Sequence, residues 1–397
     1  MHPFDDELNR RLAELREQDL FRELHPVHSA QGSRIKIDGK NFLNFSSNDY
    51  LGLADHPALK EAAIKAVEKF GAGAGASRLV CGSLTPFHEL EEALAAFKKT
   101  EAALTFATGY AAAMGTITAL VGKEDVVILD KLVHASIVDA AKLSGAKLRI
   151  FDHNDLDDLK KILTWAGKFR AENGKRKTQI LIVTESIFSM DGDAAPLREI
   201  IELKNKHGAW LMVDEAHATG IIGRGGRGLV DKLGLGDQVE VQMGTLGKAL
   251  GASGGYICGK RALIDFLVNR ARSFIFSTAP VPAAAAAATA GISLAQSAEG
   301  ETRRKKLFTH IAGLNSKLKH PDMGLHGAII PLIFGDETAA IAAMGKLRES
   351  GIFVPAIRYP SVARGAARLR ITVTAAHSAD DMAKLCTALS ELHRAKA

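Results

Sequence analysis

The residues Asp214-Glu215-Ala216-His217 place two carboxylates and an imidazole within four positions. One chemistry served by such a box is that of a nucleotide-driven helicase, in which the aspartate binds the magnesium ion of ATP. That chemistry also needs an upstream G-x-x-x-x-G-K-[ST] phosphate loop between a strand and a helix. The only G-x-x-x-x-G-K string begins at Gly254, downstream of the box, and has Arg261 where Ser or Thr should bind magnesium. The sequence therefore excludes this type of ATPase.

A glycine-rich stretch, "GRGGRG" at 223–228, follows the box and formally matches the fingerprint of dinucleotide binding. That fingerprint has to follow a strand directly and open a helix, because the phosphates bind at the helix start. No strand-like run leads directly into 223–228. The stretch is therefore predicted to be a flexible surface loop.

Polar residues follow three apolar runs of the chain. Asp214 comes directly after "AWLMV", Glu185 and Ser189 follow "QILIVT", and Lys248 lies in the glycine-rich "GTLGKALGASGG" after "VEVQM". In open α/β sheets, ligands bind at the carboxyl ends of the strands. These side chains are therefore expected to converge on one site.

An anion-binding site is predicted at Thr108-Gly109-Tyr110, because these residues precede the helical stretch "AAAMGTITALV" and a helix start exposes free amides. Singly, Lys248 could be a surface lysine and Asp214 a helix cap. Together with His217 they match the needs of pyridoxal 5′-phosphate. Its phosphate binds a helix start, a lysine forms an imine with its aldehyde, and a carboxylate keeps its pyridine nitrogen protonated.

The elements that must position these residues alternate along the chain from about residue 58. Short apolar runs are separated by helix-length segments, which is typical of a mostly parallel sheet covered on both faces. The fold class is therefore α/β. The runs are "LTFATGY", "DVVILD", "KLRIFD", "QILIVTES", "AWLMVDEA" and "GGYICG".

The two ends of the chain differ from this central part. Leucines at helical spacing among charges predict an amphipathic helix over 5–24, interpreted as an arm. Prolines followed by the alanine run of "STAPVPAAAAAATAGISLAQSAE" predict a long connecting helix, beyond which 300–397 is expected to form a smaller α+β unit. The predicted division is an arm at 1–50, a large domain at 51–285 and a small domain at 286–397.

Composition narrows the possible partners. Lys and Arg exceed Asp and Glu by 51 to 45, which suits anionic ligands, but no basic run is interleaved with aromatics, so nucleic acid is not expected. Cys81, Cys258 and Cys386 lie too far apart to indicate a disulfide framework or a zinc site, and no metal is expected. The mixed-charge N-terminus and the absence of an apolar run of about 20 residues predict a soluble, cytoplasmic protein without a membrane partner.

Strings through nearly the whole chain resemble the α-oxoamine synthase family of fold-type I pyridoxal-phosphate enzymes. The resemblance implies a large domain with a mostly parallel sheet, a smaller α+β C-terminal domain, and a homodimer with sites at the subunit interface. It also implies condensation of an amino acid with an acyl-coenzyme A thioester, releasing carbon dioxide and coenzyme A. The matching strings are "NFSSNDYLGLADHP", "GAGASRLVCGSLTPFHELEE", "DKLVHASIVDAAKLSGAKLRIFDHND", "ESIFSMDGDAAPL", "VDEAHATG", "GTLGKALGASGGY", "FIFSTAPVP" and "ARLRITVTAAH".

The resemblance implies catalytic roles for three residues. Lys248 is similar to the lysine that binds the cofactor aldehyde, Asp214 to the partner of the pyridine nitrogen, and His134 to the imidazole stacked on the ring. Cofactor contacts are also implied for His217 at the phenolic oxygen, Gly109, Tyr110 and Thr245 at the phosphate, Ser277 of the partner subunit and Thr278 of the partner subunit at the same phosphate, Ser189 at the ring, and Glu185 nearby.

Four residues are similar to substrate-binding positions. Arg370 in "ARLRIT" resembles the arginine that binds the amino acid carboxylate, with Arg368 as the alternative, and Asn48 lies near that carboxylate. Arg22 and Ser361 resemble contacts of the acyl substrate. Two interpretations stay open for Asn48 and Glu185: direct ligand contact, or a local role in capping a turn and orienting a neighbour.

The branches of the family differ in amino acid and acyl chain. "NFSSNDYLGL", "FSMDGDAAPL", "VPAIRYPSVARGAARLRITVTAAH" and "FRELHPV" are most similar to the branch that joins L-alanine to a pimeloyl thioester in biotin synthesis. Ala363 in place of a usual proline, and Ser361 in place of threonine, depart from it near the acyl pocket. Glycine with an acetyl thioester, serine with a palmitoyl thioester, and an inactive pyridoxal-phosphate-binding scaffold are the alternatives.

Overall fold

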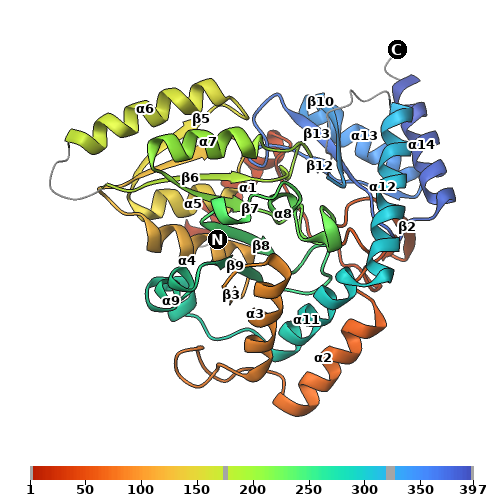
Figure 1. Ribbon diagram of the computed structural model, residues 1–397. Helices are drawn as coiled ribbons and strands as arrows, with labels where there is room; N and C mark the ends of the chain where they lie inside the picture. Colours follow the sequence, from red (N-terminus) through yellow and green to blue (C-terminus); the bar gives the residue numbers. More distant parts are fainter. Residues whose placement is uncertain (1–2, 173–177, 319–326, 395–397) are drawn as a thin grey trace.

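A seven-stranded sheet forms the centre of the protein in the computed structural model, which describes residues 3–172, 178–318 and 327–394 (Figure 1). β9 is antiparallel to both of its neighbours, and every other neighbouring pair is parallel. The expected mostly parallel α/β sheet is therefore confirmed. In spatial order the strands are β3 (Ala102–Phe106), β9 (Gly255–Gly259), β8 (Val241–Thr245), β7 (Trp210–Asp214), β6 (Ile180–Glu185), β4 (Val126–Asp130) and β5 (Lys147–Phe151).

Helices cover both faces of this sheet. α4 and α5 lie on one face and α6 and α7 on the other (Figure 1). This cover explains why every residue of β3, β4, β6 and β9 is buried, whereas the edge strand β5 is mostly exposed. The helices up to this region are α2 (Pro57–Phe70), α3 (Thr85–Lys98), α4 (Gly109–Leu120), α5 (Ala135–Ser144), α6 (Leu156–Glu172), α7 (Leu197–His207), α8 (Leu229–Lys232), α9 (Arg261–Arg270) and α10 (Arg272–Ile275), with short 3-10 turns at Arg224–Gly226 and Gly236–Gln238.

The alanine run forms helix α11 (Pro282–Gln296), which starts with a proline in its first turn as expected. α11 packs against α2 and α3. A Cβ atom built on Gly291 would collide with the carbonyl oxygen of Leu250, so the absence of a side chain lets the helix press against the turn that carries Lys248. The chain then breaks at Ser297, which is extended, and continues as α12 (Ala298–Leu318).

The C-terminal part combines strands and helices, as expected for an α+β unit. β10 (Ile329–Gly335), β13 (Ala367–Thr372) and β12 (Ala356–Ile357) form one antiparallel sheet, and α13 (Glu337–Glu349) packs on it. Strands from the N-terminal segment, β1 (Arg34–Ile37) and β2 (Lys40–Asn44), pair with β11 (Ile352–Phe353) in a second small sheet. The last helix is α14 (Ala379–Arg394), which packs against α12 and α13.

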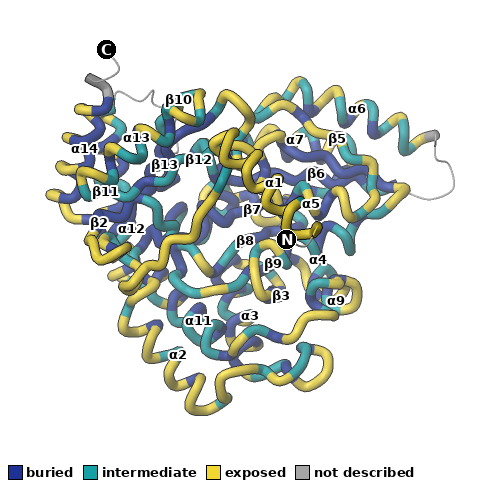
Figure 2. The backbone as a smooth tube through the Cα atoms, turned by 180° about the vertical axis from the view of Figure 1, so that it is seen from behind, coloured by how far each residue is buried: buried dark blue, intermediate teal, exposed yellow. Residues whose placement is uncertain are grey.

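The N-terminal helix is shorter than predicted. α1 (Pro3–Glu17) ends because Asp19 adopts a left-handed φ of 54°, and the amides of Leu20 and Phe21 turn back to the carbonyl of Leu15. The prediction of helix up to residue 24 was therefore wrong. α1 buries none of its residues, and Figure 2 shows it as an exposed segment on the rear of the molecule. Among the described residues, no helix is both long and apolar enough to cross a membrane.

Candidate active site

The strand-end residues meet at one edge of the central sheet. β6 ends at Glu185 and β7 at Asp214, and these two residues are direct neighbours in the parallel register. β8 ends at Thr245, one strand further along, and the turn after it carries Lys248. Parallel strands bring their carboxyl ends to the same side of a sheet, which is why residues more than 60 positions apart share this edge.

Lys248 lies in a tight turn between β8 and β9. The amide of Gly251 donates to the carbonyl of Lys248 at 2.9 Å, and Gly251 has a left-handed φ of 68° that favours glycine. The half-buried Lys248 side chain reaches His217, with 2.7 Å between Nζ and Nε2. Burial lowers the pKa of Lys248 from its ordinary 10.5 to about 8, although the carboxyls of Asp214 and Glu185 oppose this shift.

Asp214 and Glu185 are buried carboxyls with different environments. Burial raises the pKa of Asp214, whereas the nearby Lys248 lowers it, and Asp214 Oδ1 accepts the amide of Ala216 at 2.9 Å. Burial, with the charge of Asp214 beside it, raises the pKa of Glu185 well above its ordinary value. Glu185 accepts the Ser189 amide at Oε2 at 3.1 Å, and the backbone amide of His134 also bonds this carboxyl. Both carboxyls therefore have a raised pKa, and the positive charge of Lys248 opposes the rise in each.

Tyr50 joins the site, although no signal in the sequence pointed to it. Its hydroxyl lies 2.5 Å from His217 Nδ1 and 3.2 Å from Asn48 Oδ1. Burial raises the pKa of Tyr50 to about 12, so the hydroxyl keeps its proton, and burial lowers the pKa of His217 well below its ordinary value, so the imidazole is neutral. Because Tyr50 donates its proton to Asn48 Oδ1, its hydroxyl oxygen can accept from Nδ1 of the neutral imidazole, which leaves Nε2 as the acceptor that faces Lys248.

We expect Tyr50→Phe to weaken pyridoxal-phosphate binding about fivefold, because one buried hydrogen bond contributes about 1 kcal/mol and the tautomer of His217 loses its support. Titration of the apoprotein with the cofactor, followed by fluorescence, measures the affinity. Tyr256→Phe is a matched control, since it removes another buried tyrosine hydroxyl, which bonds Thr219 at 2.7 Å instead of His217. An unchanged affinity in Tyr50→Phe would show that the tautomer does not depend on this hydroxyl.

The predicted anion-binding site lies at the start of α4. The side chain of Thr108 caps this helix by accepting the amide of Ala111 at 3.0 Å, which leaves the amides of Gly109 and Tyr110 as first-turn donors. A Cβ built on Gly109 would lie 3.7 Å from the Cβ of Thr245, so these two predicted phosphate contacts are neighbours. The arrangement offers backbone donors to an anion, whereas the Thr245 hydroxyl donates to the carbonyl of Gly254 at 2.9 Å.

His134 caps the start of α5, where its Nδ1 accepts the amide of Ser136 at 3.2 Å. Burial lowers its pKa, and the charge of Asp214 is the largest opposing influence, so the imidazole lies within electrostatic reach of that carboxylate. Its predicted stacking on the cofactor ring stays a prediction.

Arg370 and Arg368 have different partners. Arg368 forms an ion pair with Asp191, with 2.6 Å between Nη1 and Oδ1. Arg370 has no carboxylate partner among the described ion pairs; its Nε donates to the carbonyl of Ser189 at 2.7 Å, and both terminal nitrogens face Asn48 Oδ1 at 3.2 Å. A carboxylate would bind at this same two-nitrogen edge. The geometry therefore favours Arg370 over Arg368 for carboxylate binding.

The two predicted acyl contacts lie in one region. Arg22 donates to the carbonyl of Tyr359 at 3.2 Å, and Ser361 follows two residues later in the loop between β12 and β13. This loop leads directly into the strand that carries Arg370. Ser277 and Thr278 lie elsewhere, on an exposed segment after α10 where Thr278 forms a bridge with Ser77. In the part of the chain that the structure describes, neither residue bonds Lys248 of the same chain, and the resemblance assigns both to the partner's site.

The glycine-rich stretch 223–228 is a packed turn, so the prediction of a flexible surface loop was wrong. Gly228 approaches the carboxylate of Glu215 so closely that a Cβ would collide with it. Glu215 accepts the amide of Val230 at 2.9 Å and forms a fully buried ion pair with Lys98, which also donates to the carbonyl of Arg227 at 2.5 Å. The turn thus closes over the residue next to Asp214.

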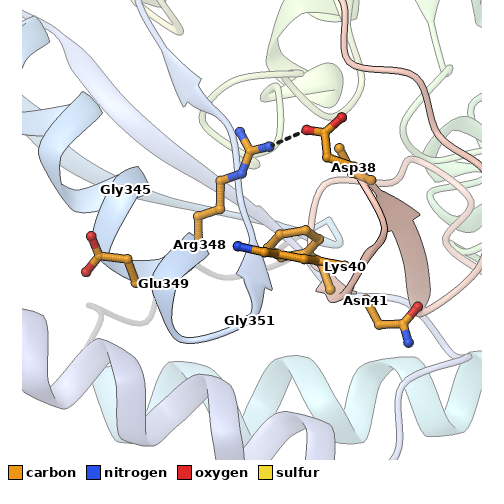
Figure 3. Close-up of a pocket in the computed structure, with 9 residues that line it drawn as sticks. Asp38, Lys40, Asn41, Gly345, Arg348, Glu349 and Gly351 are labelled. Carbon is orange, nitrogen blue, oxygen red and sulfur yellow. Dashed lines mark ion pairs between the residues drawn. The ribbon is translucent and has the colours of Figure 1, made fainter.

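A surface pocket in Figure 3 lies apart from these residues. It is formed by the β1–β2 turn and the end of α13. Its Arg348 is 3.5 Å from the carboxylate of Asp38, so this positive charge already has a partner. None of the residues predicted to bind cofactor or substrate lines this pocket.

The residues at the sheet edge fit pyridoxal 5′-phosphate. The fit rests on an amine with a lowered pKa at Lys248, a buried carboxyl at Asp214 within electrostatic reach of that amine, and the open helix start at Gly109. These are the groups required for the aldehyde, the pyridine nitrogen and the phosphate. Among the described residues, no group of three or more His, Cys, Asp or Glu is placed to hold a metal ion.

Comparison with known proteins agrees with this fit. The model of the aminotransferase class I and II family matches residues 40–389. The 8-amino-7-oxononanoate synthase of Geobacter sulfurreducens is 45% identical over 384 residues, covering 96% of each chain. The solved structure of the Francisella tularensis 8-amino-7-oxononanoate synthase is 27% identical, with a TM-score of 0.73, and covers 89% of this chain and 98% of its own. A serine palmitoyltransferase variant from S. paucimobilis, with bound PLP-myriocin aldimine, is 29% identical, with a TM-score of 0.89, and covers 98% of this chain and 97% of its own.

Proposed function

This chain belongs to the aminotransferase class I and II family, and on that basis we propose that it condenses L-alanine with a pimeloyl thioester. The products are 8-amino-7-oxononanoate, carbon dioxide and the free thiol of coenzyme A or of a carrier protein, in biotin synthesis. The chain is a pyridoxal-phosphate-dependent acyltransferase. The observation that carries this proposal is the convergence of Lys248, Asp214 and Arg370 in a chain about 45% identical to 8-amino-7-oxononanoate synthases over nearly its full length.

In this reaction Arg370 binds the α-carboxylate of the amino acid, and Ser189 and Asn48 orient its guanidinium. Bound pyridoxal 5′-phosphate supplies a pyridine ring that withdraws electrons from the substrate Cα. Asp214 holds a proton on the pyridine nitrogen. Lys248 Nζ removes the α-proton, because a pKa of about 8 suits a general base near neutral pH.

The condensation itself needs no oxidant or reductant. The substrate Cα forms a bond to the thioester carbonyl carbon, the carbon–sulfur bond breaks, and the thiolate takes up a proton. We assign to His134 the polarisation of the thioester oxygen. The bond from Cα to its carboxylate breaks to release carbon dioxide, and the ammonium of Lys248 returns a proton to Cα.

The lowered pKa of Lys248 predicts how cofactor attachment depends on pH. Only the neutral amine adds to an aldehyde, so the attachment rate of the apoprotein should rise with pH and level off above about 8. An ordinary lysine would continue to gain reactivity up to about pH 10.4. Stopped-flow absorbance at several pH values measures the rate. A rate that still climbs steeply between pH 9 and 10 would contradict the lowered pKa.

The proposed assembly is a homodimer in which Ser277 of the partner subunit and Thr278 of the partner subunit help to hold the phosphate. Supporting this, α1 leaves apolar side chains exposed at the surface: Phe4, Leu8, Leu12 and Leu15 are 64%, 40%, 38% and 40% exposed. Sedimentation of the holoenzyme at micromolar concentration tests the assembly. A fully active monomer would contradict it.

Measuring the rate of thiol release identifies which pair of substrates the protein prefers. L-alanine, glycine and L-serine are each combined with pimeloyl, acetyl and palmitoyl thioesters, and we expect L-alanine with pimeloyl to be fastest. Serine with a palmitoyl thioester is the second candidate, because a serine palmitoyltransferase superimposes with a TM-score of 0.89. Preference for serine and palmitoyl, or for glycine and acetyl, would overturn the proposed substrate. Absence of thiol release with every pair would favour an inactive scaffold.

A further inference from the structure

His153 is held on both sides of its ring, although it is not one of the residues predicted to bind cofactor or substrate. Its Nδ1 lies 2.9 Å from Asp130 Oδ1 and its Nε2 lies 2.8 Å from Asp193 Oδ2. A ring nitrogen donates to a carboxylate only when it carries a proton, so two such partners favour the imidazolium. Burial opposes that charge, but the hydrogen bonds to Asp130 and Asp193 raise the pKa of His153 to about 10. His153 is therefore a cation at neutral pH.

His153 thus bridges two aspartates, and the first of them, Asp130, belongs to the central sheet. Asp130 is the last residue of β4 and is 1% exposed. Its carboxylate also accepts the amides of Leu132 at 2.8 Å and Asn154 at 3.0 Å. Because these backbone contacts fix the carboxylate, the imidazolium has a fixed position at the end of the sheet.

The other side of the bridge holds a turn between residues 188 and 193. Phe188 and Asp193 are joined by a backbone hydrogen bond of 2.9 Å, and the amide of Gly192 donates back to the carbonyl of Phe188 at 2.9 Å. His153 binds the side chain of Asp193 and packs edge-on against the ring of Phe188, with 4.4 Å between ring centroids. The imidazolium therefore contacts both ends of the turn.

The same turn carries the groups that hold the two arginines of β13. The carbonyl of Ser189, directly after Phe188, accepts Nε of Arg370 at 2.7 Å. Asp191 forms the ion pair with Arg368. A shift of the turn would therefore move the acceptor that orients the guanidinium of Arg370.

We propose that His153 is a positioning residue for substrate recognition: by bridging Asp130 to Asp193, it fixes the turn whose Ser189 carbonyl aims Arg370 at the carboxylate of the amino acid. This inference rests on the proposed function, in which Arg370 binds that carboxylate. His153 itself touches no reacting atom. Its effect is on the affinity for the amino acid, with no direct effect on the thioester.

Two variants test the bridge from its two ends. His153→Gln removes the charge and one of the two hydrogen bonds, and Asp193→Asn leaves His153 in place but weakens the contacts of the turn with His153 and with Asn154, whose Nδ2 donates to Asp193 Oδ2 at 3.0 Å. In both, we expect the Kd and the KM for L-alanine to rise about tenfold while the KM for the thioester stays within about twofold. Calorimetry on the holoenzyme gives the Kd. Hydrogen exchange of the apoprotein, read by mass spectrometry, should be faster in 186–195 than in the wild type.

His310→Gln is the matched control. His310 is another partly buried histidine, but it bonds the carbonyl of His377 at 3.0 Å and has no contact with the turn, so its variant should keep the wild-type Kd. Unchanged exchange in 186–195 together with an unchanged Kd for L-alanine would overturn the inference. It would also be overturned by a lower melting temperature with both KM values unchanged, which indicates a purely structural role. If the wild type prefers another amino acid, the proposed substrate fails, and the same Kd measurement with that amino acid still decides the role of His153.

Discussion

Lys248→Ala is expected to lower turnover by about 10³-fold or more, since the variant loses both the amine that binds the cofactor aldehyde and the general base. Thiol release with the preferred substrate pair measures this loss. Borohydride treatment gives a second measurement: mass spectrometry should find the reduced cofactor on Lys248 of the wild type and on no residue of the variant.

Lys260→Ala provides the matched control for that experiment. Lys260 also follows a glycine, but it is exposed and forms a surface ion pair with Glu101 at 2.9 Å. Such pairs contribute about 0–1 kcal/mol, so the control should keep its activity and its cofactor. Normal turnover in Lys248→Ala would refute the assignment of this lysine and, with it, the proposed chemistry.

Asp214→Asn is expected to lower turnover by about 10³-fold, because a neutral amide cannot keep the pyridine nitrogen protonated, and electrostatic groups of this kind contribute on this scale. The amide oxygen can still accept the amide of Ala216. Burial raises the pKa of Asp214, so at any pH above the pKa of the unfolded state the ionised carboxylate destabilises the folded protein. Removing this charge should therefore not lower the melting temperature of the apoprotein at neutral pH. Activity and melting temperature, measured together, therefore separate loss of function from loss of fold.

Glu185→Gln is the comparison that isolates the charge. Glu185 is the register neighbour of Asp214, and burial raises its pKa well above the ordinary value, which favours the neutral acid. Replacing a neutral acid with a neutral amide should cost less than about tenfold in turnover. If both variants lose activity equally, the charge is not located on Asp214.

The sheet and the main residues of the site followed from the order of residue types along the chain. Runs of β-branched and aliphatic residues mark buried strands, because both faces of a parallel sheet are covered by helices. Asp214, Glu185 and Lys248 could be placed at one edge because each follows such a run, and parallel strands bring their carboxyl ends together. This reasoning needs only local sequence and the rule for parallel sheets.

Contacts between distant segments could not be predicted in this way. The hydroxyl of Tyr50 meets His217 across 167 residues, and Arg370 meets the Ser189 carbonyl across 181 residues. Neither contact produces a periodic pattern in the sequence. The first depends on how an N-terminal segment packs on the central sheet, and the second on how a C-terminal strand does. The wrong prediction for 223–228 has the same origin: its glycines match a mobile loop in composition, but they allow close packing over Glu215.

The sequence by itself determined the α/β class, the strand-end site and the chemical types gathered there, because hydrophobic periodicity and strand direction are local properties. Only the tertiary structure decided the states of those groups. Burial raises the pKa of both neighbouring carboxyls, that of Glu185 well above its ordinary value, and it lowers the pKa of Lys248 to about 8. It also decided that Arg370, rather than Arg368, has no carboxylate partner within the described ranges, because Asp191 comes to lie beside Arg368 only in the folded chain.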